Sequence, residues 1–298
     1  CLPMNMVPQK LAEFTGARTR VVWTQQQKAC NDFVGCLKDF KLMVFDSDQG
    51  ERVLMDEIAA YSAPRITPKG DRIVFNNNTE RGMFIINWDG TGLRPLGDRQ
   101  YVLATWIDPE TGIEWAYSRP NTGEQWNSKS KPIIRTQLDN PDAVEEVWNK
   151  KSVTLGWFQP SRDGSSAATC MFWPSAGRVT LPHGEFTFYN KGCWTSLAPD
   201  DSGRMWVFRG NHRSVLLYDA EGNPLHLLDM GGAPLFRGWE MYHPRWSNNV
   251  QFFTCTGPFS GNRDHACTPE EWDEYNVNKL PNLIPQGGYN VELLVGKI

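Results

Sequence analysis

The densest group of reactive side chains in the 298-residue sequence is the run from Trp239 to Arg245. Tyr242 and His243 belong to the residue types that act as general bases, and Arg245 can neutralise a carboxylate beside them. This combination suits a lyase that removes a proton next to the carboxylate of an acidic sugar. The alternative interpretation is that His243 is a hydrogen-bonded structural residue beside a Pro-Arg pair. Both interpretations stay open at the level of the sequence.

Other catalytic and cofactor-binding motifs do not occur in the sequence. It has no GxSxG nucleophile elbow, which argues against a peptidase, and no GxGxxG or P-loop run. The segment Asp46–Gly50 is similar to a calcium loop but lacks the distal glutamate, and a hairpin turn explains it better. No HxH or HExxH spacing occurs among the five histidines, which are His183, His212, His226, His243 and His265. We therefore expect no metal and no cofactor.

A repeated strand–turn–strand unit must position these residues. In each copy a short apolar strand enters a tight polar turn and leaves as a second apolar strand. Self-similarity at a period of roughly 40–50 residues is the signature of a radially repeated architecture. Four copies lie at Pro64–Phe75, Trp157–Gly164, Ser196–Trp206 and Pro244–Phe253, and a degenerate fifth lies at Thr105–Trp115.

These repeats predict an all-β fold, a single β-propeller of about six four-stranded blades, with seven as the alternative count. The first unit lacks an inner strand and the last lacks an outer strand, so we expect the N- and C-terminal strands to pair and close the ring. Residues 1–9 are expected to form an N-terminal tether and residues 10–298 the propeller domain. A long excursion at 257–288, with a short helix at Pro269–Tyr275, interrupts the last blade.

Two runs carry a resemblance to a known family. PRITPKGDRIVF and MFIINWDGTGLRPL resemble the TolB-type β-propeller repeat, a Ser-Pro-Asp-Gly-like turn followed by a strand that ends before Asp-Gly. GCWTSLAPDDSGRMWVF and YHPRWSNNVQFFT are similar to uncharacterised secreted bacterial propellers related to TolB. The chain departs from the pattern at Lys69 and at Asn248-Asn249. The resemblance covers nearly the whole chain and implies a propeller, whereas such propellers host binding, lyase and peptidase-associated roles alike.

Superimposing the repeats on their turns yields a column of candidate ligand-binding residues. The residue two before each turn is apolar and is expected to pack between blades. The residue before that must point to the opposite face, toward the centre of the ring. Indoles stack on apolar sugar faces and arginine binds carboxylates, so this second column predicts a site for a sugar or uronate. Its candidate residues are Arg65, Trp106, Trp157 and Arg245, with Ser196 at the equivalent position.

The column also has a purely structural interpretation. Tryptophan at such positions packs between blades, and arginine pairs with a turn carboxylate. Under that interpretation the column stabilises the ring and binds no ligand.

The seven cysteines suggest an exported protein. Six form local pairs that predict disulfides, although six cysteines allow 15 pairings and reduced, buried thiols are the alternative. The first residue, Cys1, is consistent with the lipid-modified first residue of a bacterial lipoprotein. The alternatives are an arbitrary boundary of the sequence and simple cleavage of an ordinary signal peptide. The pairs are Cys30 with Cys36, Cys170 with Cys193, and Cys255 with Cys267.

The composition of the chain limits the classes of partner that we expect it to bind. A net charge of −4 without any Lys/Arg run speaks against nucleic acid, and no apolar stretch approaches the ~18 residues of a membrane span. We expect a monomeric periplasmic or extracellular binding module for carbohydrate or a cell-envelope protein, attached to a membrane only through a lipid on Cys1. The alternative is a carbohydrate-active lyase or hydrolase that acts on an acidic glycan. A purely structural partner-binding role comes third.

Overall fold

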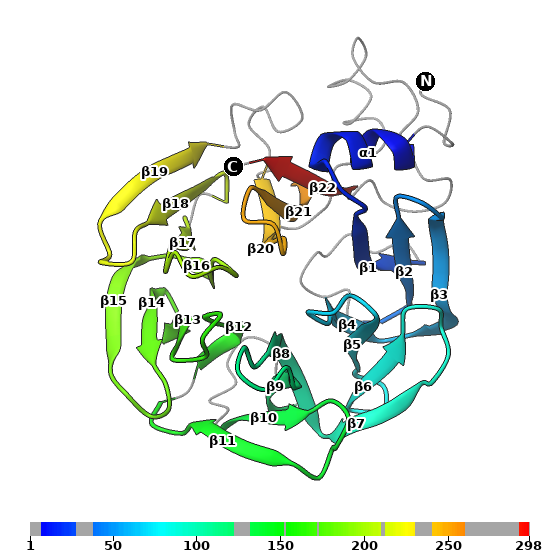
Figure 1. The fold of residues 1–298 in the computed structure, drawn as a ribbon, viewed down its shortest axis with the longest axis horizontal. Helices are drawn as coiled ribbons and strands as arrows, with labels where there is room; N and C mark the ends of the chain where they lie inside the picture. The colour runs from blue at the N-terminus through cyan, green and yellow to red at the C-terminus, as the bar shows by residue number, and fades with distance from the viewer. Residues whose placement is uncertain are drawn as a thin grey trace.

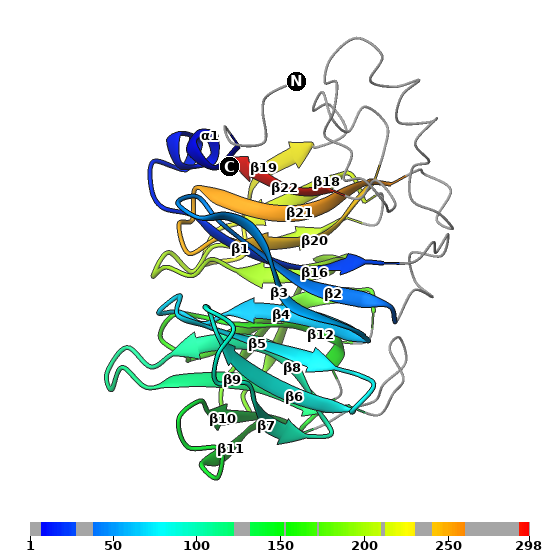
Figure 2. The same cartoon turned by 90° about the vertical axis from the view of Figure 1, so that its right-hand side faces the viewer.

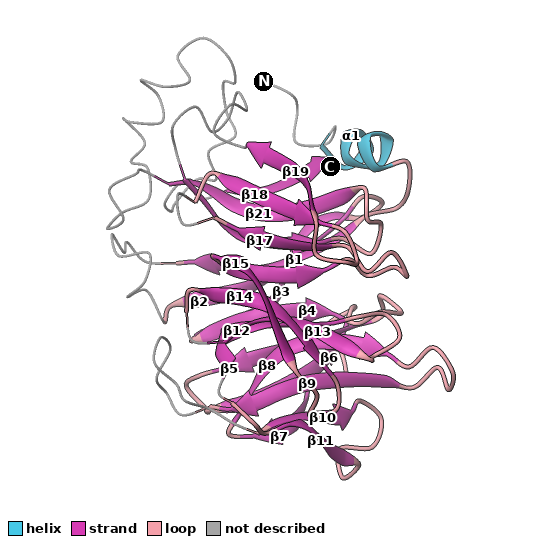
Figure 3. Ribbon diagram, turned by 90° about the vertical axis from the view of Figure 1, so that its left-hand side faces the viewer, coloured by secondary structure: helices cyan, strands magenta, loops and turns pink. Residues whose placement is uncertain are grey.

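The computed structural model describes residues 7–27, 38–121, 132–151, 153–171, 173–209, 212–229, 240–259 and 292–297. Within these residues the chain forms six antiparallel sheets arranged in a ring around a central axis (Figure 1). Views from the edge of the ring show that the strands run along the short dimension of the molecule (Figures 2 and 3). The expected β-propeller of six blades is therefore confirmed.

Each blade is numbered by its order in the chain. The first blade contains β1 (Arg20–Gln26), β2 (Phe40–Asp46) and β3 (Gly50–Ala59), and the second contains β4 (Tyr61–Ile66), β5 (Arg72–Asn77), β6 (Gly82–Asn87) and β7 (Arg94–Asp98). The third contains β8 (Gln100–Ile107), β9 (Glu114–Pro120), β10 (Ile133–Gln137) and β11 (Val144–Trp148). The fourth contains β12 (Val153–Pro160), β13 (Ser166–Met171), β14 (Ser175–Thr180) and β15 (Phe186–Lys191).

The last two blades follow the same order. The fifth contains β16 (Cys193–Leu197), β17 (Met205–Phe208), β18 (Ser214–Tyr218) and β19 (Pro224–Asp229). The sixth contains β20 (Glu240–Trp246), β21 (Phe252–Phe259) and β22 (Glu292–Lys297). The late third strand of this blade agrees with the expectation of a strand after the excursion. Residues 260–291, which include most of that excursion and the expected helix, lie outside the described residues.

The connections between blades identify the strand positions missing at the two ends of the chain. One residue joins an outer strand to the next inner strand at Ala60, Arg99 and Gly192. Because β3 leads into β4 in this way, β3 is an outer strand and the described part of the first blade lacks an inner strand. Strands β20, β21 and β22 correspond to the first three strands of a blade. In the described chain β1 pairs with β2, and β22 pairs with β21.

The repeated turn has a constant hydrogen-bond pattern. In the second blade the amide of Thr67 donates to the carbonyl of Arg72, and the amide of Gly70 donates to the carbonyl of Thr67. Equivalent bonds close the turn of the fourth blade at Ser161 and Gly164. Each inner strand is thereby followed by a second strand that lies one step farther from the axis.

A helix that the sequence did not reveal precedes the first blade. Helix α1 spans Val7–Thr15, so it begins inside the segment that was expected to be a tether. The ring of Phe14 packs edge-on against Phe252 of β21, with the centroids 5.5 Å apart. The helix therefore contacts the sixth blade, and the chain then enters the first. Among the described residues no helix is long and apolar enough to cross a membrane.

The core consists of layers between neighbouring blades. A first cluster joins Leu42 and Val44 of β2 to Ile73 and Phe75 of β5. A second joins the third and fourth blades around Tyr117 and Phe158. Strand β5 shows the effect on a single strand: Ile73, Val74 and Phe75 are consecutive and all buried, because both faces of a blade are covered by its neighbours.

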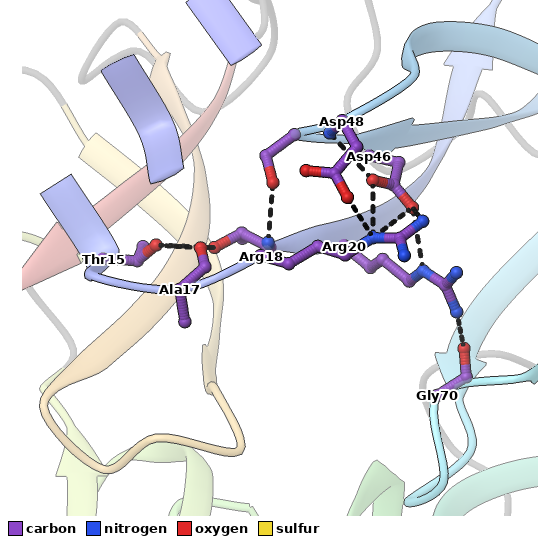
Figure 4. A network of polar contacts seen from close by, with 9 residues as sticks. Thr15, Ala17, Arg18, Arg20, Asp46, Asp48 and Gly70 are labelled. Carbon is purple, nitrogen blue, oxygen red and sulfur yellow. Dashed lines mark hydrogen bonds and ion pairs between the residues drawn. The ribbon is translucent and has the colours of Figure 1, made fainter. Parts of the chain in front are cut away.

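Buried carboxylates link the turns of adjacent blades. Asp46 is 2% exposed and accepts hydrogen bonds from Arg18 and Arg20, while Arg20 Nη1 donates to the carbonyl of Gly70 in the second blade (Figure 4). The second link has the same design. Glu114 of β9 is 1% exposed and accepts from Arg72 Nη2 at 2.6 Å and from the amide of Lys69 at 2.9 Å.

The expected disulfide between Cys170 and Cys193 is absent. Cys170 Sγ lies 3.6 Å from the carbonyl oxygen of Gly192, and Cys193 Sγ lies 4.0 Å from His212 Nε2. Both thiols, with that of Cys255, belong to one apolar cluster, where cysteine packs as a small hydrophobic residue. No disulfide is formed by any of the three cysteines that the structure describes. Cys1, Cys30, Cys36 and Cys267 lie outside the described residues.

Candidate functional site

Three inner strands carry a β-bulge at the same step. Ala63 in β4, Trp194 in β16 and His243 in β20 are each the fifth residue before the turn of their blade, and their φ angles are 50°, 40° and 53°. The pairing register with the second strand shifts at this step in all three. A left-handed conformation costs a non-glycine residue about 1–2 kcal/mol. Bulges re-aim side chains and occur often near functional sites, so this step is where we looked for one.

Arg65 and Arg245 each lie two residues after the bulge of their strand, in β4 and β20. Burial in the protein, followed by the charge of Arg65, lowers the pKa of Arg245 well below its ordinary value. A guanidinium nevertheless stays charged at neutral pH, so the two groups repel each other. Both side chains are half-buried and keep surface exposed to solvent. Two of the four residues in the predicted column are thus brought together.

Backbone carbonyls hold Arg65 in place. Its Nε donates to the carbonyl of Leu103 in the third blade at 3.2 Å, and its Nη1 donates to the carbonyl of Pro64 at 2.9 Å. Within the described residues no carboxylate forms an ion pair with it. Two bonds fix the guanidinium and leave further N–H donors on its outer nitrogens. The predicted pairing of this arginine with a turn carboxylate is therefore not observed.

His243 lies beside this arginine pair and is exposed. Its position deep in the ring, followed by the charges of Arg245 and Arg65, lowers the pKa of its imidazole below the ordinary value of 6.5. Water reaches the exposed imidazole and reduces the effect of burial on its pKa. The two neighbouring positive charges also lower this pKa, because they disfavour the protonated imidazole. The imidazole is therefore neutral at pH 7, with one nitrogen that accepts a hydrogen bond and one that donates.

Tyr101 and Arg119 belong to the same group, and the sequence did not single them out. Tyr101 in β8 is half-buried and close enough to influence the pKa values of both Arg65 and Arg245. It is paired across the sheet with Arg119 of β9, whose guanidinium lies 4.9 Å from the centre of the phenol ring. A Tyr–Arg pair directly opposite on two adjacent strands is a recognisable sequence signal once the register is known.

Tyr242 is placed in packing rather than at the axis. It is 5% exposed, and its ring lies against Trp194 at 5.6 Å and against His212 at 4.6 Å. The ring of His243 also meets Trp194, edge-on at 5.2 Å. Of the two candidate bases, His243 alone is accessible to a ligand.

The two tryptophans of the predicted column lie between blades. Trp106 is 7% exposed, and its Nε1 donates to the carbonyl of Arg162 in the fourth blade at 2.8 Å. Trp157 is 4% exposed and packs against Trp194 with the ring centres 5.0 Å apart. Neither indole has an open face for a sugar, so the packing interpretation describes both. We leave them out of the candidate site.

The candidate site therefore comprises Arg65, Arg245, His243 and Tyr101, from the inner strands of the second, sixth and third blades. Its charged groups are cations, and they favour an anion. No cluster of three or more His, Cys, Asp or Glu side chains with metal-binding geometry occurs in the described ranges.

Comparison with solved structures agrees with this architecture. TolB from Acinetobacter baumannii superimposes with a TM-score of 0.58 at 12% identity, over 88% of this chain and 67% of that one. A gluconolactonase from Xanthomonas campestris superimposes with a TM-score of 0.53 at 12% identity, over 82% of this chain and 87% of the other. A putative TolB from Agrobacterium tumefaciens does so with a TM-score of 0.50 at 12% identity, over 83% and 80%.

These similarities show the fold, and the chain is a β-propeller protein whose neighbours include TolB and a gluconolactonase. No protein-family profile matches the sequence, and no curated protein matches it either.

Proposed function

We propose that this propeller is a binding module for an acidic carbohydrate, which it holds at the axis with Arg65 and Arg245. The observation that carries the proposal is the placement of Arg65 and Arg245 at the same step of two inner strands, β4 and β20, with the exposed imidazole of His243 two residues before Arg245. A positively charged group favours a nearby anion, and an anionic ligand that contacts both arginines interacts favourably with each. Arginine forks bind carboxylates through paired, charge-assisted hydrogen bonds.

The neutral imidazole supports a sugar as the part of the ligand next to the acid. A neutral ring nitrogen of His243 accepts a hydrogen bond from a hydroxyl group. A hydroxyl beside a carboxylate is the arrangement found in uronic acids. A simple aliphatic acid would use the arginines and leave the imidazole without this contact.

Isothermal titration tests this proposal with galacturonate oligomers and with neutral glucose oligomers of the same length. We expect the acidic oligomers alone to bind, and Arg65→Gln to weaken their binding about tenfold or more. The matched control is Arg162→Gln, which removes an exposed arginine that pairs with Asp201 and lies in the turn of the fourth blade. Equal binding of acidic and neutral oligomers, or equal loss in both variants, would refute the proposal.

The same site favours a second candidate, a lyase that acts on an acidic glycan. Its basis is the exposed, neutral His243 beside two guanidiniums that would neutralise the substrate carboxylate. The imidazole would take the proton from the carbon next to that carboxylate, and the glycosidic oxygen would leave as the double bond forms. Ultraviolet absorbance of new unsaturated ends measures this reaction. If the wild type binds oligomers without releasing such ends, the binding role stands alone; if His243→Gln binds but stops the release, the lyase is supported.

Export is also proposed, as a periplasmic or extracellular monomer with a lipid on Cys1, and a cell-envelope protein is the alternative partner. The similarity to TolB from A. baumannii supports the fold on which this proposal rests. Mass spectrometry of the natively expressed protein and of its N-terminal peptide tests for lipidation of Cys1, because an acyl group adds mass to both. An unmodified N-terminal peptide would refute lipidation.

A further inference from the structure

The outer strand of the fifth blade, β19, is an exposed sheet edge. It lies on the perimeter of the ring, and among the described strands it pairs only with β18 (Figure 1). Five of its six residues are exposed, and Leu225 and Leu227 are 48% and 50% exposed. The free side of an edge strand presents unpaired N–H and C=O groups, with which another strand can pair.

Four other outer strands carry features that hinder pairing at an edge. Charged side chains, proline and β-bulges have this effect. Strand β15 changes register in its middle, where Ala176 pairs with Asn190 but Gly177 pairs with Phe188. Strands β3, β7 and β11 contain charged residues or proline along their length, namely Arg52, Asp56, Pro95, Glu145 and Glu146. These edges are therefore less suited to pairing than an uncharged, regular strand.

Strand β19 lacks such features along most of its length. Its proline is the first residue, Pro224, and its charged residue is the last, Asp229. A register shift lies beside Pro224, and from His226 onward the pairing with β18 is regular. Leu228 packs against the apolar cluster around Trp206, which holds the strand on the blade. The edge therefore offers backbone hydrogen bonds together with the two exposed leucines.

The turn before β19 is acidic. Asp219 and Glu221 lie in this turn, and neither the turn nor the strand contains Lys or Arg. Hydrogen bonds from Asn223, led by that of its side chain, hold the pKa of Asp219 below the ordinary value of 3.8, so its carboxylate is charged at neutral pH. A second copy of this chain would bring the same acids and a net charge of −4. A segment with lysine or arginine at its end complements this edge better.

We propose that β19 binds an extended segment of another protein, which adds to the fifth blade as a further strand. The segment has alternating apolar residues and a basic residue at the end that meets the acidic turn. In strand addition the main-chain hydrogen bonds provide affinity, and the alternating side chains provide specificity. This edge lies on the outside of the ring, whereas Arg65 lies on an inner strand, so the inference is independent of the proposed sugar site.

A synthetic peptide tests for strand addition. The probe is a fluorescent peptide of alternating valine and threonine with two lysines at each end. One comparison peptide has N-methyl groups on two adjacent central residues, which block both of its edges, and the other has glutamate in place of every lysine. We expect the probe to bind in fluorescence anisotropy and to slow hydrogen exchange of the β19 amides, and each comparison peptide to bind at least about tenfold more weakly. Equal binding of the probe and the N-methylated peptide would overturn the inference.

Leucine-to-lysine variants test where the probe binds. Leu227→Lys places a charge on the edge and should weaken binding of the probe about tenfold, because charged residues hinder edge pairing. The matched control is Leu93→Lys, at a leucine that is 48% exposed and lies outside the outer strands, and this variant should bind like the wild type. Equal loss in both variants would overturn the inference. Absence of β19 protection in the wild type would also overturn it, and that measurement needs no variant to fold.

Two further measurements separate this inference from the alternatives. Sedimentation reports self-association, and self-association that Leu227→Lys abolishes would assign the edge to a second copy and overturn the inference. Titration with galacturonate oligomers reports on the proposed sugar site separately, because Leu227→Lys should leave that binding unchanged.

Discussion

Removing the carboxylate of Glu114 should test the turn links between blades more sharply than any other single change. Glu114 lies in β9 and is 1% exposed. It accepts hydrogen bonds from Arg72 Nη2 at 2.6 Å and from the amide of Lys69 at 2.9 Å. Glu114→Ala deletes both bonds and leaves the Arg72 side chain, which is 14% exposed, without its buried partner.

The expected loss follows from that burial. Breaking a buried, hydrogen-bonded ion pair by removing one partner costs about 3–5 kcal/mol. Urea unfolding followed by tryptophan fluorescence measures this loss, which should also lower the melting temperature by about 5 °C or more. Glu114→Gln keeps an acceptor of the same shape and should lose less.

The chain offers a matched control on the same arginine. Arg72 also pairs with Asp139, whose side chain is 71% exposed. An exposed ion pair contributes about 0–1 kcal/mol, so Asp139→Ala should leave the free energy of unfolding nearly unchanged. Equal losses in Glu114→Ala and Asp139→Ala, or a loss below about 1 kcal/mol in Glu114→Ala, would show that burial does not decide the strength of this link.

Three further predictions concern pH, thiols and turns. Burial alone would raise the pKa of Asp46, but hydrogen bonds, led by the one from Arg18, hold this pKa well below the ordinary 3.8. The ionised carboxylate therefore stabilises the folded protein above pH 3.8, and this contribution is lost as the pH falls below that value. The difference in unfolding free energy between the wild type and Asp46→Asn should shrink from about pH 5 to about pH 3, and a constant difference would contradict the assignment. Burial raises the pKa of the Cys170 and Cys255 thiols to about 12. Iodoacetamide should therefore label both cysteines only after denaturation, as measured by the mass of their peptides. Labelling of the folded protein would contradict their burial. Gly164 and Gly112 have similar φ angles, 71° and 69°, but a Cβ on Gly164 would lie 2.7 Å from Trp106, whereas a Cβ on Gly112 would meet open space. Gly164→Ala should therefore destabilise the protein in urea unfolding by about 1–3 kcal/mol more than Gly112→Ala. Equal losses would contradict the packing of Gly164 against Trp106.

Local sequence signals were sufficient to predict the blades. Alternating β-branched and aromatic residues, with turns at Asp89-Gly90 and at Pro68, mark strands that the structure reproduces within a few residues. Helix α1 was not predicted because its apolar residues Leu11 and Phe14 form only a short stripe, which packs through Phe14 against the distant Phe252. That contact exists only in the folded ring, so no local sequence pattern predicts it.

The site was predictable in part. The column of equivalent positions identified Arg65 and Arg245, because a repeat assigns the same direction to the same step of each strand. It also selected Trp106 and Trp157, because the direction of a side chain does not predict how deeply it is buried. Burial of a large indole against the neighbouring blade is favourable, and there Trp106 donates a hydrogen bond to the carbonyl of Arg162. Tyr101 was missed because it lies before the bulge, where simple alternation no longer predicts which face a side chain occupies.

The shared bulge has a consequence for how such a protein acquires new specificity. Ala63, Trp194 and His243 have nearly the same backbone conformation but entirely different side chains. The strained geometry therefore belongs to the scaffold and not to any one residue. Trp194 uses this step for packing, because it is 5% exposed and lies against Trp157, whereas the side chain of His243 is exposed. Variation at position 243 should therefore change what the ring recognises while the architecture stays the same.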